Sequence, residues 1–118
     1  MPRNKKLREC QKFEGPRLFK PVGVPLNQLP VTGVDLDELE AMRLCDREGL
    51  DQAQAAERMK VSRETIQRLL YSGRKKIVDS LLQSRAISIE TGPHIKEMES
   101  RPGRGRGRGR GRGNPPDR

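Results

Sequence analysis

The stretch from Leu50 to Tyr71, LDQAQAAERMKVSRETIQRLLY, constrains the fold most, because its pattern predicts two short helices joined by a tight turn. Asp51 and Gln54 have the spacing of a capping box at the start of the first helix, and Ser62 is an N-cap candidate for the second. Apolar residues then recur at helical spacing and predict the buried faces of both helices. These residues are Ala55, Ala56, Met59, Ile66, Leu69 and Leu70.

The opposite face of the second helix is polar. Long polar side chains on such a face suit the reading of base edges in the DNA major groove, and the basic run after it suits phosphate contact. The candidate DNA-binding residues are Lys60, Ser62, Arg63, Glu64, Thr65, Gln67, Arg68, Tyr71, Arg74, Lys75 and Lys76. The alternatives are an ordinary helical hairpin with a solvated outer face and, for residues 74–76, a solvated charged turn.

Two residues depart from the usual helix-turn-helix pattern. Lys60 occupies the turn position that most often holds Gly, and a left-handed backbone there costs a non-Gly residue on the order of 1 kcal/mol. We therefore expect a slightly strained turn at Lys60. Gly73 either permits close approach of another helix or breaks the second helix in two.

The remaining segments complete an expected all-α domain. Residues 1–12 are expected to be a basic N-terminal arm that is disordered alone and that either lies along phosphates or is solvated. Residues 13–34 carry four prolines and both phenylalanines, which predict an extended segment with one short strand packed on the core; a disordered linker is the alternative. A helix capped by Asp35 and Glu38 is expected at 35–47, ending near Gly49. Residues 86–89 alternate apolar and polar side chains and predict one short strand within the helical domain, which spans 35–99. The Arg/Gly-rich residues 100–118 predict a disordered cationic tail.

Charge points to a polyanionic partner. The 118 residues, 31% of them hydrophobic, suffice for about one domain, and the net charge is +9 with an isoelectric point near 10.3. Residues 35–57 hold eight acidic and two basic residues, whereas residues 58–76 hold seven basic and one acidic. A chain with one side on phosphates and an acidic side in solvent has this polarity.

Catalytic chemistry is not indicated. His94 is the single histidine and is expected on the surface, and the carboxylates at 35–40 are explained by the dipole of the helix that they begin. We expect no metal site, no cofactor and no enzyme activity. The chain lacks an apolar run of membrane-spanning length or a signal-peptide pattern, and its two cysteines lie far apart, which favours a reduced, cytoplasmic setting.

Four collinear segments carry a family resemblance: FKPVGVP, DELEAMRL, GLDQAQAAERMKVSRETIQRLLYSGRKK and AISIETG. They resemble an uncharacterised prokaryotic family of predicted DNA-binding proteins whose helix-turn-helix is similar to region 4 of the sigma-70 family. The resemblance implies a sigma region 4-like fold of the winged-helix-like class, with residues 62–71 as the recognition helix.

The expected function is that of a sequence-specific DNA-binding protein, a transcriptional regulator, whose partner is double-stranded DNA. Two alternatives stay open. One is a protein-interaction module that contacts RNA polymerase, as sigma region 4-like domains do, and the other is an RNA-binding protein that acts through its basic tail. A homodimer is also open.

Overall fold

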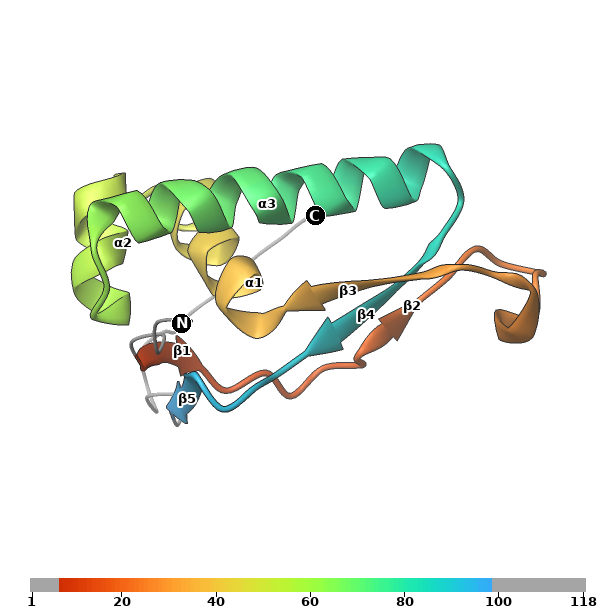
Figure 1. Cartoon of the computed structure of the whole chain (residues 1–118), viewed down its shortest axis with the longest axis horizontal. Coiled ribbons are helices and arrows are strands. Elements are labelled where there is room, and N and C mark those ends of the chain that lie inside the picture. The colour runs from red at the N-terminus through yellow and green to blue at the C-terminus, as the bar shows by residue number, and fades with distance from the viewer. Residues whose placement is uncertain (1–6, 99–118) are drawn as a thin grey trace, which may run out of the picture.

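The computed structural model describes residues 7–98 and shows a mixed α/β fold. The strands are β1 (Arg8–Gln11), β2 (Leu18–Phe19), β3 (Val31–Asp35), β4 (Ala86–Glu90) and β5 (Ile95–Met98). The helices are α1 (Leu36–Met42), α2 (Gln52–Met59) and α3 (Arg63–Leu82), with a 3-10 turn η1 (Leu26–Gln28) and a π-helical segment η2 (Arg43–Arg47) that continues α1. Figure 1 shows α3 along one side of the molecule, α1 and α2 beside its N-terminal half, and the strands on the other side.

The expectation of an all-α fold is wrong, because five strands form two sheets. The short strand predicted at 86–89 is present as β4, but it is the centre of a sheet in the order β2-β4-β3. It pairs in parallel with β3, from Val31 opposite Ala86 to Asp35 opposite Glu90, and antiparallel with β2. The proline-rich segment that cannot form a helix therefore supplies the partners of β4.

The N-terminal arm also differs from the prediction. Its residues Arg8–Gln11 form β1, which pairs in parallel with β5, and Arg8 is buried. The Arg8 guanidinium contacts the Asp37 carboxylate, with 2.9 Å between Nη1 and Oδ2. This part of the expected arm is thus part of the fold. Residues 1–6 and the expected disordered tail at 100–118 lie outside the described residues.

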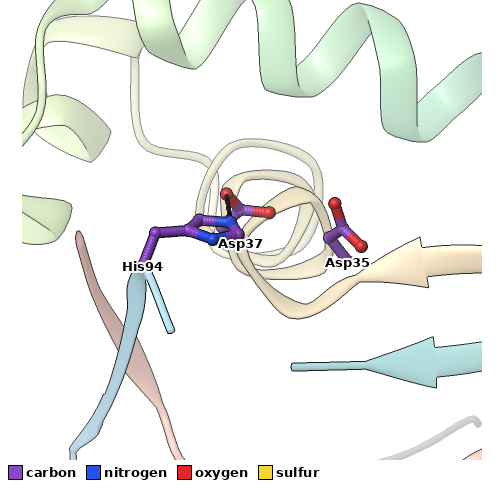
Figure 2. Close-up of side chains that lie close together, drawn as sticks. All are labelled: Asp35, Asp37 and His94. Atoms are coloured by element: carbon purple, nitrogen blue, oxygen red, sulfur yellow. Dashed lines mark ion pairs between the residues drawn. The ribbon is translucent and has the colours of Figure 1, made fainter. Parts of the chain in front are cut away.

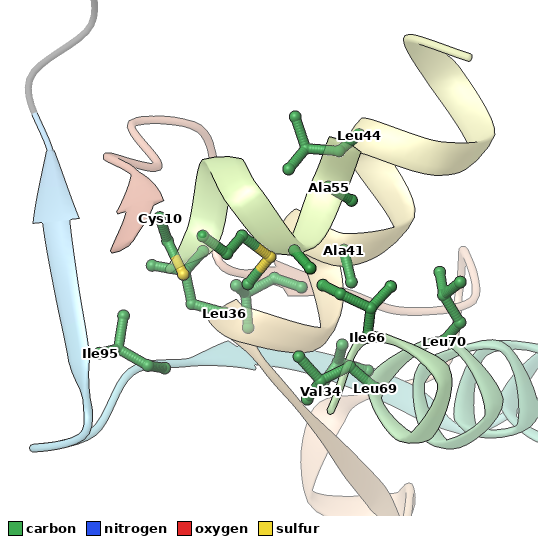
Figure 3. Packing of buried hydrophobic residues seen from close by; sticks show 13 residues of the cluster. Cys10, Val34, Leu36, Ala41, Leu44, Ala55, Ile66, Leu69, Leu70 and Ile95 are labelled. Atoms are coloured by element: carbon green, nitrogen blue, oxygen red, sulfur yellow. The ribbon is translucent and has the colours of Figure 1, made fainter. Parts of the chain in front are cut away.

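The core lies where the three helices meet (Figure 3). The predicted apolar faces of α2 and α3 are all buried, and α1, β1, β3 and β5 cover them. The largest fully buried apolar side chains include Leu36, Leu44, Met59, Ile66 and Leu70. Burying each of these stabilises the fold by about 1.5–3 kcal/mol relative to exposure. The phenylalanines contribute less than expected, because Phe13 is only partly buried and Phe19 is exposed.

Gly73 sets the distance between α1 and α3. A Cβ atom at this position would lie 2.8 Å from Met42 Cε and 3.1 Å from Glu38 Cβ, which is closer than ordinary van der Waals contact. Helix α3 continues through Gly73 without a break. The structure therefore supports close helix approach, and the alternative of two separate helices is wrong.

The first helix begins and ends as its sequence predicts. The Asp35 backbone N–H donates to Glu38 Oε1 at 2.9 Å, which is one half of the capping box. After η2 the chain leaves the helix at Gly49, whose φ of 81° is in the left-handed region that glycine tolerates best. Within the described residues, no helix is long and apolar enough to cross a membrane.

Candidate nucleic-acid interface

The α2–turn–α3 unit is held by two caps. At the start of α2, the Gln54 backbone N–H donates to Asp51 Oδ1 at 2.8 Å, and the Asp51 N–H donates to Gln54 Oε1 at 3.0 Å. At the start of α3, Ser62 Oγ accepts from the Thr65 backbone N–H at 3.1 Å. These bonds satisfy N–H groups that have no partner within the helix. Both predicted N-caps are confirmed, and they fix where each helix starts.

The turn is strained at the predicted residue. Lys60 has φ 63° and ψ 43°, in the left-handed region. Its backbone N–H reaches the carbonyls of Ala56 and Glu57, which closes the C-terminus of α2. The hydrogen bonds and the packing of the flanking helices hold this conformation against its intrinsic cost.

One face of the N-terminal half of α3 projects into solvent. Arg63, Glu64 and Gln67 are exposed, and their side chains make no hydrogen bond or ion pair with other described residues. Tyr71 continues this face one turn beyond Gln67 and is 71% exposed. Arg68 is also exposed, but its Nη2 donates to Thr65 Oγ1 at 3.2 Å. The side chains most suited to a ligand therefore lie on a capped helix over the core.

Two predicted site residues stabilise the first turn of α3. Thr65 is buried, and its hydroxyl lies 2.9 Å from Ser62 Oγ. Ser62 is occupied as the N-cap. Both hydroxyls are engaged by the first turn of α3, but Ser62 remains exposed, and the DNA-binding role of the two residues stays a prediction.

The basic run at 74–76 is paired with carboxylates. Arg74 makes two hydrogen bonds to Asp46, at 2.7 and 3.2 Å, and this bonding raises the pKa of Arg74. Lys75 Nζ lies 3.1 Å from Asp79 Oδ2 on the next turn. Both pairs are about half exposed, and such pairs are worth only about 0–1 kcal/mol, so phosphates can replace the carboxylates.

Lys76 is different, because its Nζ lies 2.9 Å from Oε1 of Glu38, whose side chain is 5% exposed. The Ser72 hydroxyl donates to the other Glu38 oxygen. Lys76 therefore ties α3 to α1, and its role as a phosphate-binding residue stays a prediction.

Only part of the acidic segment at 35–57 faces solvent: Asp46, Glu48, Asp51 and Glu57 are exposed, but the carboxylates of α1 are not. Asp37, Glu38 and Glu40 are all more than nine-tenths buried. Asp37 pairs with Arg8, Glu38 with Lys76, and Glu40 with Arg43 at 2.9 Å. Their negative charge is thus compensated inside the fold and does not oppose a polyanion at α3. Sequence reasoning missed these pairs, since the Arg8 and Lys76 partners are distant along the chain.

His94 is not the surface residue that was expected. Its side chain is 18% exposed, and its Nε2 lies 3.4 Å from Asp37 Oδ2. Asp35 completes a cluster in which one ligand atom from each residue lies within 4.8 Å of the others (Figure 2). No local spacing signals this cluster, because Asp35 and Asp37 lie at the start of α1, whereas His94 follows all three helices.

Comparison with known proteins identifies the family. Residues 1–97 match the model of the family described as "Protein of unknown function DUF134". The chain belongs to this family. DUF134 relatives include a UPF0251 protein of Dehalococcoides mccartyi strain BAV1, which is 44% identical over 102 residues that cover 86% of each chain. A UPF0251 protein of Thermoanaerobacter pseudethanolicus is 46% identical over 92 residues that cover 78% of each chain.

The expected resemblance to an uncharacterised family is therefore confirmed at the level of the family. The descriptions of these relatives name no partner or activity. No solved structure matches the chain.

Proposed function

We propose that this DUF134 protein is a sequence-specific DNA-binding protein, a cytoplasmic transcriptional regulator, that places the N-terminal half of α3 in the major groove. The observation that carries the proposal is the exposed face formed by Arg63, Glu64, Gln67 and Tyr71 on a capped helix. A rigid helix with outward polar side chains near its N-terminus has the geometry of a recognition helix.

Each exposed side chain has a partner on DNA that suits its chemistry. Arg63 and Gln67 are one helical turn apart. The Arg63 guanidinium can donate two hydrogen bonds to the guanine edge, and the Gln67 amide can donate to N7 of adenine and accept from its N6 amino group. Glu64 can accept from the cytosine amino group. Arg68 needs to give up only its bond to the Thr65 hydroxyl to reach the same groove.

Flanking cations would hold the phosphates. Lys60 is exposed in the turn, and Arg74 and Lys75 are exposed further along α3. Arg74 can release Asp46, and Lys75 can release Asp79, to bind a phosphate. The free-energy cost is small, because both existing ion pairs are exposed to solvent. The net charge of +9 supports attraction to a polyanion over distance.

Selection of binding sites from a random duplex pool tests the proposal. The full-length protein should enrich one motif, and its affinity for that motif should exceed its affinity for random duplex by about 10³-fold or more. A two-fold repeat in the motif would indicate that the protein binds as a homodimer. Failure to enrich any duplex motif, with retention of RNA or of RNA polymerase instead, would favour the corresponding alternative function.

Two glutamine variants make the test specific for α3. Gln67→Ala should weaken binding to the selected site by about 1–3 kcal/mol and change binding to random duplex much less. Gln83→Ala is the matched control, because Gln83 is exposed at the opposite end of the same helix. Equal losses for the two variants, or equal losses on selected and random duplexes, would contradict base readout by Gln67.

A further inference from the structure

Three side chains from separate segments converge beside the start of α1. Asp35 ends β3, Asp37 lies in the first turn of α1, and His94 lies just before β5. One oxygen or nitrogen ligand atom from each lies within 4.8 Å of the other two. In Figure 2 the His94 ring and the Asp37 carboxylate face each other, and the second Asp37 oxygen points toward Asp35.

The cluster contains buried polar atoms that the described residues leave unsatisfied. The Asp37 side chain is 2% exposed, and its Oδ1 has no hydrogen-bond partner, while Oδ2 is held by Arg8. His94 Nε2 is likewise buried without a hydrogen bond. A buried polar atom without a partner is destabilising, and a buried charged atom without one is more so. An outside ligand that binds both atoms removes this cost.

A cation is the ligand that these donors fit. We propose that Asp35, Asp37 and His94 form a binding site for a divalent first-row transition-metal ion such as Zn²⁺. An imidazole nitrogen with two carboxylate oxygens suits Zn²⁺, Fe²⁺, Co²⁺ or Ni²⁺, whereas Mg²⁺ and Ca²⁺ prefer oxygen ligands alone. Three protein ligands leave room for water on the ion.

The distances agree with such a site. Ligand atoms about 2.0–2.2 Å from a tetrahedral ion lie about 3.3–3.6 Å apart. His94 Nε2 lies 3.4 Å from Asp37 Oδ2, the oxygen that Arg8 holds, and the ion would bind Oδ1 of the same carboxylate. The 4.8 Å limit of the whole cluster exceeds that spacing by about 1.5 Å, so binding draws the side chains together.

Charge and supporting contacts also fit. Arg8 holds one Asp37 oxygen at 2.9 Å and leaves the other for the ion, which is a supporting role common around metal ligands. Lys76 faces the same region but pairs with Glu38. Two carboxylates and one neighbouring guanidinium leave a net negative charge for a divalent ion to neutralise. The bound ion would link the segment before β5 to the start of α1.

NMR of the single histidine tests the proposal directly, since no other imidazole contributes signals. Full-length protein without an affinity tag, treated with a chelator and dialysed, is titrated with Zn²⁺ while the two ring nitrogens of His94 are recorded. One equivalent should shift the Nε2 resonance and saturate, and Co²⁺ should give visible absorption bands typical of bound ions. Unchanged ring resonances at saturating Zn²⁺ would overturn the proposal.

Variants locate the ligands. His94→Ala and Asp37→Asn should each weaken Zn²⁺ binding by about 100-fold, whereas Asp79→Asn, which changes an exposed carboxylate on α3, should leave it unchanged. Equal affinity of the wild type and His94→Ala would overturn the site. Asp37→Asn leaves Arg8 without its carboxylate and can destabilise the fold, but the wild-type titration and His94→Ala decide the question without it.

Discussion

The close contact at Gly73 leads to a quantitative prediction about α1 and α3. Replacing Gly73 with Ala improves helix propensity by about 0.8–1 kcal/mol. The new methyl group would lie 2.8 Å from Met42 Cε and 3.1 Å from Glu38 Cβ. Glu38 is fixed by its bonds to Lys76 and Ser72, so the Met42 side chain has to leave its packed position to make room. Overpacking of this kind costs about 1–3 kcal/mol. We therefore expect Gly73→Ala to lower the free energy of unfolding by about 1 kcal/mol.

A double-mutant cycle separates the two contributions. Met42→Ala removes both the Cε and Sδ atoms that crowd the new methyl group, so Gly73→Ala in that background should be neutral or stabilising. Urea denaturation of the four proteins gives the coupling free energy, which we expect to be about 1–2 kcal/mol in favour of the double variant. If Gly73→Ala stabilises the wild type by the full propensity gain, with no coupling to Met42, the reasoning about close helix approach is refuted.

Three further predictions concern the turn, the buried ion pairs and a buried thiol. Lys60→Gly should raise the free energy of unfolding by about 1 kcal/mol, because it relieves the left-handed backbone; an equal or lower denaturation midpoint would contradict the strain. Glu38→Gln should lower that free energy by about 2–3 kcal/mol, since Lys76 loses its buried charge partner, and a loss below 0.5 kcal/mol would show that the pair is worth no more than a surface pair. Burial, with Glu40 nearby, raises the pKa of Cys10 to about 12, so its thiol contributes stability that is complete below pH 9 and is lost as the pH rises toward 12. The stability difference between wild type and Cys10→Ala should therefore fall by up to about 1.4 kcal/mol per pH unit above 9, and a constant difference from pH 8 to 10.5 would contradict this.

Local signals in the sequence predicted the α2–turn–α3 unit well. The capping box of Asp51 and Gln54, the Ser62 cap and the left-handed turn at Lys60 all depend on residues within one or two helical turns. Such interactions are visible in the spacing of residue types alone. The exposed face around Gln67 followed from the same periodicity, because burial of one helix face leaves the other in solvent.

Interactions between distant segments could not be predicted in this way. The β3–β4 ladder pairs Val31–Asp35 with Ala86–Glu90, and all three helices lie between these strands in the sequence. No local pattern in β3 indicates which segment pairs with it. The ion pair of Lys76 with Glu38 and the contact of His94 with Asp37 could not be predicted for the same reason, because the partners are distant along the chain. The count of charges along the chain predicted exposed carboxylates at Asp37, Glu38 and Glu40. Each is instead buried beside a cationic partner, which compensates its charge.

The central claim, that the exposed face of α3 contacts DNA, is tested most directly at Tyr71. It is the only tyrosine, it is 71% exposed, and it lies on the proposed recognition face. Full-length protein that carries 3-fluorotyrosine therefore gives a single ¹⁹F resonance from this position. Addition of the selected duplex should shift or broaden that resonance, with saturation at the dissociation constant measured by fluorescence anisotropy of the labelled DNA. Saturated DNA binding with an unchanged Tyr71 resonance would contradict the account, because the DNA would then be held by another part of the chain.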